Sequence, residues 1–142
     1  MMKKGFTLLE TLITLGVLSL VLLLFVYQPR RDWQEEISTR HFFDELSHAL
    51  HYAQEVALVS GYAVHVRFRV SQNAIQIIYP PEVTDSKMIV LPENLDLRSN
   101  WQFYYDRHGR VNTFGRAVIL ESRTNKRYEV VFQLGSGKFD IR

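Results

Sequence analysis

A long apolar run near the N-terminus limits what this chain of 142 residues can fold into. Residues Phe6–Tyr27 hold one charged side chain, Glu10, in 22 positions. A helix of this length spans roughly 33 Å, enough to cross a hydrocarbon core of about 30 Å. As a buried core helix it would need cover on every side, which so small a chain could not supply. We therefore expect one membrane-spanning helix, followed by a domain outside the bilayer.

The composition excludes several classes of function. The chain carries 17 Lys+Arg against 15 Asp+Glu and has no cysteine. Without cysteine it cannot be a disulfide scaffold, hold a Cys-ligated metal or perform thiol chemistry. Its length excludes a large multidomain enzyme. The net charge of +2 is too small to argue by itself for nucleic-acid binding.

The residues in front of the apolar run identify its type. Lys3 and Lys4 precede Gly5, which is followed by Phe-Thr-Leu-Leu-Glu. A secretory signal peptide has a shorter apolar core and a small-residue cleavage site after it, and neither is present. A plain signal anchor fits the length but leaves Glu10 without a role. The stretch KKGFTLLE resembles the type IV prepilin signal of pilins and pseudopilins.

This resemblance implies a processing site and an assembly residue. Prepilin peptidase would cut between Gly5 and Phe6 on the cytoplasmic side, and Phe6 would then be N-methylated. The helix stays on the mature protein, with Glu10 as its fifth residue. Since an unpaired carboxylate in an apolar helix costs several kcal/mol, we expect Glu10 to pair with the Phe6 amine of a neighbouring subunit. The alternative is that Glu10 only reaches the lipid headgroups.

A second helical segment follows the apolar run. From Asp32 to Ser60, apolar residues recur mostly every three or four positions. They are Trp33, Ile37, Phe42, Phe43, Leu46, Ala49, Leu50, Ala53, Val56 and Ala57. Gly61 ends this helical pattern. Pro29, which lies before the pattern begins, predicts a bend between the two helical segments. We expect a leader at 1–5, a transmembrane and filament-core helix at 6–28, and an amphipathic continuation at 29–60.

The remaining residues, 61–142, show the period of two that is typical of half-buried strands. Expected strands are Tyr62–Val70, Ala74–Tyr79, Lys87–Leu91, Asp96–Arg98, Trp101–Tyr105, Ala117–Glu121, Tyr128–Leu134 and Lys138–Ile141. Turn residues separate them, as at Asp106–Gly109 and Gly135–Gly137. The sequence thus predicts an α+β fold in which a long N-terminal helix packs on an antiparallel β-sheet.

The likeness to pilins extends into this domain. Phe103, Asp106, Gly109 and the closing LGSGKFDIR at Leu134–Arg142 are similar to the GspH-type minor pseudopilins. The layout is closest to the ComGD-type subunits of Gram-positive competence pili. That resemblance implies a single-pass membrane protein with an extracellular domain, part of a pilus that captures DNA for transformation.

The same resemblance implies the partners of the chain. They are other major and minor pseudopilins, the prepilin peptidase, and the assembly ATPase and platform protein of the pilus machine. Two other functions stay open from the sequence. One is a type II secretion pseudopilin for protein export, and the other is a signal-anchored binding module that never polymerises.

The sequence contains no recognisable catalytic, cofactor or metal motif. His41, His48 and His51 could share a helix stripe with Asp44 or Glu55 and bind a metal. The spacing lacks a H-E-x-x-H pattern and is also typical of a polar helix face, which we favour. We expect no enzymatic activity, no metal and no cofactor.

Basic residues in the strand region are candidates for contact with DNA. Arg67 and Arg69 lie on the polar face of one expected strand, and Arg107 and Arg110 lie in one expected turn. His108 and Arg116 are close in sequence, as are Tyr104 and Tyr105. Basic groups bind phosphates and aromatic rings stack on bases. The alternative is a solvated face with ion pairs to Asp106, Glu121 and Glu129.

Overall fold

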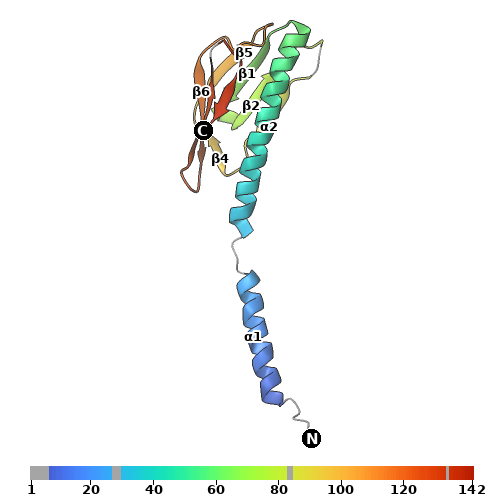
Figure 1. Cartoon of the computed structure of the whole chain (residues 1–142). Helices are drawn as coiled ribbons and strands as arrows, with labels where there is room; N and C mark the ends of the chain where they lie inside the picture. The colour runs from blue at the N-terminus through green and yellow to red at the C-terminus, as the bar shows by residue number, and fades with distance from the viewer. Residues whose placement is uncertain (1–6, 27–29, 83–84, 134) are drawn as a thin grey trace. The chain divides into compact units, whose positions relative to one another are not determined.

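The computed structural model describes residues 7–26, 30–82, 85–133 and 135–142. Within these residues the chain forms two α-helices, one short 3-10 turn and eight β-strands (Figure 1). Its internal contacts divide it into two compact units, Met1–Gln34 and Glu35–Arg142. Pro29, where the sequence predicts a bend, lies outside the described residues.

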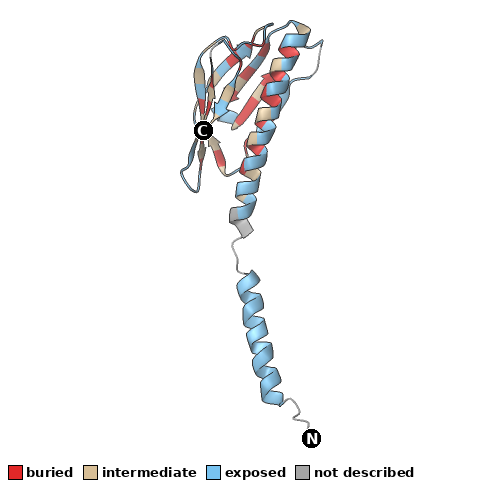
Figure 2. Ribbon diagram, in the orientation of Figure 1, coloured by how far each residue is buried: buried red, intermediate tan, exposed pale blue. Residues whose placement is uncertain are grey.

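Helix α1, Leu8–Val26, is apolar on all sides, and none of its residues is buried. All of its residues are exposed, so it stands as a uniformly exposed rod in Figure 2. It is long and apolar enough to cross a membrane. In water such a surface would be strongly unfavourable, because roughly 25 cal/mol is lost per Å² of exposed apolar area. The surface of this helix is therefore suited to contact with lipid or with other helices.

Helix α2, Arg30–Ser60, buries one face against the strands, which Figure 2 shows as a stripe. The buried apolar residues are Phe42, Leu46, Ala49, Leu50, Ala53, Val56 and Ala57. The first buried residue is Thr39, whose Oγ1 accepts a 2.7 Å hydrogen bond from the Asn94 amide. Trp33 and Ile37 were expected on the packed face, but they are 76% and 54% exposed. Burial of this helix begins only at Thr39.

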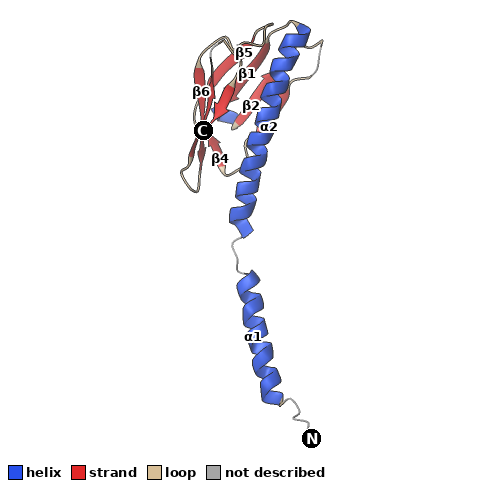
Figure 3. Cartoon of the chain, viewed as in Figure 1, coloured by secondary structure: helices blue, strands red, loops and turns tan. Residues whose placement is uncertain are grey.

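The strands form two four-stranded antiparallel sheets (Figure 3). The first has the order β3-β2-β1-β5, with β1 Val64–Arg69, β2 Ala74–Ile78, β3 Lys87–Val90 and β5 Trp101–Tyr105. The second has the order β4-β6-β7-β8, with β4 Leu95–Leu97, β6 Gly115–Glu121, β7 Arg127–Phe132 and β8 Phe139–Ile141. The α+β class and the antiparallel pairing are confirmed, but the strands make two sheets where one was expected.

Aromatic side chains join the two sheets in a common core. The rings of Phe103 on β5 and Phe132 on β7 lie 4.4 Å apart between centroids, and both side chains are buried. Trp101 stacks on Phe103 at 4.9 Å and on Phe68 at 5.8 Å. Such pairs contribute about 0.5–1.5 kcal/mol each beyond burial of area. The cluster fixes the relation between the sheets.

Strand β1 is shorter than the alternating pattern predicts. Tyr62 and Val70 are exposed, and Val70–Gln72 form the 3-10 turn that leads into β2. Asn73 closes this turn with φ at 44°, and its side chain bonds to the backbone of Leu95 and Leu97. The left-handed residue reverses the chain, which ends the strand before the apolar pattern does.

Candidate functional site

Glu10 lies in the first turn of α1, where the helix begins. Its backbone N–H donates to the Thr7 carbonyl oxygen at 3.0 Å, and the Thr7 Oγ1 lies 3.4 Å from the same nitrogen. Thr7 and Glu10 thus have the spacing of a capping box, a pattern that starts helices. The carboxylate makes no ion pair among the described residues. Gly5 and Phe6, the expected cleavage and methylation residues, lie outside them.

Two threonine hydroxyls within α1 are satisfied by the helix itself. The Thr11 hydroxyl donates to the Leu8 carbonyl at 2.8 Å, and the Thr14 hydroxyl donates to the Glu10 carbonyl at 2.9 Å. A hydroxyl bonded in this way can enter hydrocarbon without losing a partner. Glu10 is the one charged side chain of α1, and a carboxylate in hydrocarbon calls for a partner from outside the helix.

The four arginines proposed for DNA contact fall into two separate pairs. Arg67 and Arg69 lie on β1 beside the start of β5, because Phe68 pairs with Trp101. Arg107 and Arg110 follow the other end of β5. The five-residue strand between them spans roughly 13 Å. The four arginines therefore form two separate basic sites and not one patch.

The turn that carries Arg107 and Arg110 is organised by the Asp106 carboxylate. One oxygen of Asp106 accepts the backbone N–H of His108 at 2.8 Å and that of Arg110 at 2.9 Å. The hydrogen bond from Arg110 contributes most to holding the pKa of Asp106 below its ordinary value, and the one from His108 adds to it. The negative charge of Asp106 lies next to the turn backbone and offsets one of the two arginine charges.

Two neighbours of this turn do not support the expected patch. Tyr105 is fully buried, so it cannot stack on a base, and burial raises the pKa of its hydroxyl. Arg116 is ion-paired with Glu129 at 3.2 Å, as the alternative view expected. Tyr104 is 37% exposed and lies against His65, with 5.4 Å between ring centroids.

Two glycines of the pattern compared above with minor pseudopilins lie close together. Gly109 in the turn after β5 has φ at 67°, and Gly137 before β8 has φ at 66°. The Gln54 amide of α2 donates to the Gly109 carbonyl oxygen at 2.8 Å. A Cβ built at Gly137 would overlap that carbonyl oxygen and the Gln54 amide. This three-way junction ties α2 to both loops, and sequence reasoning missed Gln54.

We expect Gly137→Ala to destabilise the domain by about 2–4 kcal/mol, since a left-handed residue gains a Cβ and the Cβ meets backbone. Gly135→Ala is the matched control, because its φ is 77° and nothing lies within 4 Å of its Cβ. That control is expected to cost about 1 kcal/mol. Urea unfolding of the full chain in detergent micelles measures both. Equal losses of stability in the two variants would contradict the steric role of the junction.

The histidines do not gather with carboxylates. His41, His48 and His51 are all exposed on α2, and His51 packs against Phe139 at 5.1 Å between ring centroids. Within the described residues, no group of three or more His, Cys, Asp or Glu side chains could hold a metal. The arrangement is that of a polar helix face.

Comparison with known families concerns the N-terminal part of the chain. The family model of the prokaryotic N-terminal methylation motif matches residues 1–26. The chain carries a type IV pilin-like prepilin signal. This signal implies processing by prepilin peptidase and assembly with other pilins, and it indicates a structural subunit. Comparisons with curated proteins and with solved structures found no match.

Proposed function

We propose that the chain is a minor pilin subunit of a competence pilus, needed for uptake of extracellular DNA. The observation that carries the proposal is the methylation motif at residues 1–26, placed on a helix with no buried residue. A helix with no buried residue is available to bundle with others in a filament core. The α+β domain that follows, a helix with antiparallel sheets, supports the proposal because a pilin-like fold has these parts.

The proposed assembly begins in the membrane. Prepilin peptidase removes residues 1–5, and the Phe6 amine is methylated. Glu10 of each subunit then pairs with the Phe6 amine of a neighbour as the helices are drawn from lipid into the filament. An assembly ATPase and a platform protein drive this step, and the strand domain stays outside the cell. Removing Lys3 and Lys4 leaves 15 basic against 15 acidic side chains.

Deletion of the chain in the organism that carries it tests the proposed function. We expect uptake of labelled DNA to be lost while protein export continues, since the filament would serve transformation. Both are measured in the same cultures, and complementation with the wild-type chain is the control. Loss of export with normal DNA uptake would overturn the proposal in favour of a type II secretion pseudopilin.

A further inference from the structure

The outer face of the first sheet carries basic groups without acidic ones. Strand β1 directs His65, Arg67 and Arg69 outward, and the register places Gln102 and Tyr104 of β5 beside them. On the other side β2 contributes Gln76 opposite Arg67. No Asp or Glu occupies an outward-facing position of the four strands in this part of the structure. The face is therefore positive although the mature chain is close to neutral.

Arg67 and Arg69 differ from most other arginines of the domain in having no carboxylate partner. Arg98, Arg116, Arg127 and Arg142 are each within 4.0 Å of an acidic oxygen. Among the described residues, no acidic oxygen lies that close to Arg67 or Arg69. Both side chains are nevertheless half-buried. Each guanidinium offers five N–H donors, and partial desolvation strengthens their attraction for an anion.

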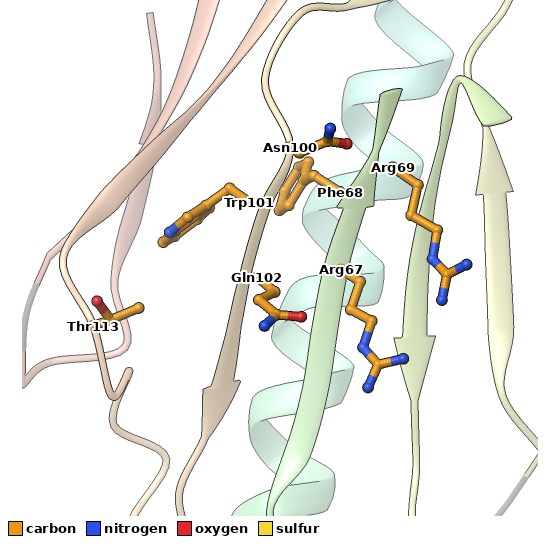
Figure 4. Close-up of a pocket in the computed structure, with 7 residues that line it drawn as sticks. All are labelled: Arg67, Phe68, Arg69, Asn100, Trp101, Gln102 and Thr113. Carbon is orange, nitrogen blue, oxygen red and sulfur yellow. The ribbon is translucent and has the colours of Figure 1, made fainter. Parts of the chain in front are cut away.

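These two side chains border an open groove of about 680 Å³ (Figure 4). Asn100, Trp101, Gln102 and Thr113 line the rest of it, with Phe68 at its base. The Asn100 side-chain oxygen accepts the Val70 N–H at 2.8 Å, so its NH₂ group is the part left for a ligand. The lining thus includes several donor groups, and the Asn100 oxygen is already used as an acceptor.

Trp101 gives the groove a rigid aromatic wall. Its indole lies against Gly115, where any Cβ would overlap the ring. The rings of Phe68 and Phe103 hold it from the core side, and the residue is only partly buried. In Figure 4 the guanidinium groups of Arg67 and Arg69 extend to the other side of β1 from the Trp101 ring, so the aromatic wall and the two cations lie at opposite borders of the groove. Nucleic-acid-binding surfaces combine basic and aromatic side chains along one path.

We propose that this groove binds the phosphodiester backbone of a nucleic acid, with Arg67 and Arg69 on neighbouring phosphates and Trp101, at the opposite border of the groove, against a sugar or base further along the strand. Residues two apart on a strand are separated by roughly 6.6 Å, so each guanidinium reaches its own phosphate. The choice of DNA among polyanions rests on the proposed function. The Asp106–Arg110 turn is not part of the site, because it follows the other end of β5 and its carboxylate offsets one of its two arginine charges.

The test uses the processed full-length chain in detergent micelles, carrying Trp33→Phe so that Trp101 is the one remaining tryptophan. Titration with a 20-nucleotide oligo(dT) is expected to change the Trp101 emission. R67Q/R69Q should weaken binding about tenfold and lower the slope of log affinity against log salt by about 1.4, since two phosphate contacts are lost. R107Q/R110Q removes the same charge, and its affinity for oligo(dT) should stay within about twofold of that of the parent chain.

Three results would overturn the inference. Equal weakening by both arginine pairs would show a general charge effect, and an unchanged Trp101 signal would place the ligand elsewhere. Equal binding of polyglutamate would indicate an acidic protein partner. The proposed function is judged separately: normal DNA uptake after deletion of the chain refutes that function but not the groove. Uptake lost on deletion, with R67Q/R69Q binding oligo(dT) normally, refutes the groove alone.

Discussion

Replacement of Gly5 by leucine is expected to leave the whole population of chains as uncleaved precursor. Gly5 is the proposed last residue of the leader and lies inside the matched motif, two residues before Thr7, after which α1 begins. A residue without a Cβ lets the backbone approach a protease closely in an extended conformation, and a leucine side chain obstructs that approach. Immunoblotting would show an unshifted band, and mass spectrometry would show no methylated Phe6.

A second glycine in the same segment supplies the control. Gly16 lies within α1, and a Cβ there meets nothing within 4 Å. Gly16→Ala is therefore expected to be cleaved and methylated as in the parent chain. If the wild-type chain itself is never cleaved, the segment is a plain signal anchor. Cleavage of the Gly5→Leu chain at the wild-type rate would contradict the assignment of the cut.

Local patterns were enough to predict most elements of the domain. The buried stripe of α2 from Phe42 to Ala57 follows helical spacing, and strand β5 has the predicted bounds of Trp101–Tyr105. The division into two sheets was not predictable. Strand β4 pairs with β6, while β5 returns to β1, and these choices depend on long-range register rather than on local periodicity.

The sites were predictable to a smaller extent. Alternation along β1 correctly separated Arg67 and Arg69 from the buried Val66 and Phe68. The groove beside them needs the pairing of β1 with β5, which brings Trp101 next to Phe68, and no local signal gives that pairing. Thr7 was recognisable as the start of a capping box from the sequence alone but was overlooked.

Glu10→Gln is expected to be processed normally and to remain in the membrane, but to be nearly absent from pili. Glutamine serves in a capping box as well as glutamate does, so the first turn of α1 keeps its support. It cannot neutralise the Phe6 amine of the next subunit. Removing one partner of a buried ion pair costs about 3–5 kcal/mol, which lowers incorporation by on the order of a hundredfold or more. The ratio of subunit in sheared pili to subunit in membranes measures this.

Thr7→Ala separates the charge of Glu10 from its place in the helix start. The change removes the hydroxyl that lies 3.4 Å from the Glu10 nitrogen but leaves the carboxylate intact. Losing a cap costs about 1 kcal/mol, and the bilayer favours the helix in any case, so incorporation should stay close to that of the parent. If Thr7→Ala lowers incorporation as much as Glu10→Gln does, or if Glu10→Gln assembles normally, Glu10 acts as a capping residue and the pairing across subunits is wrong.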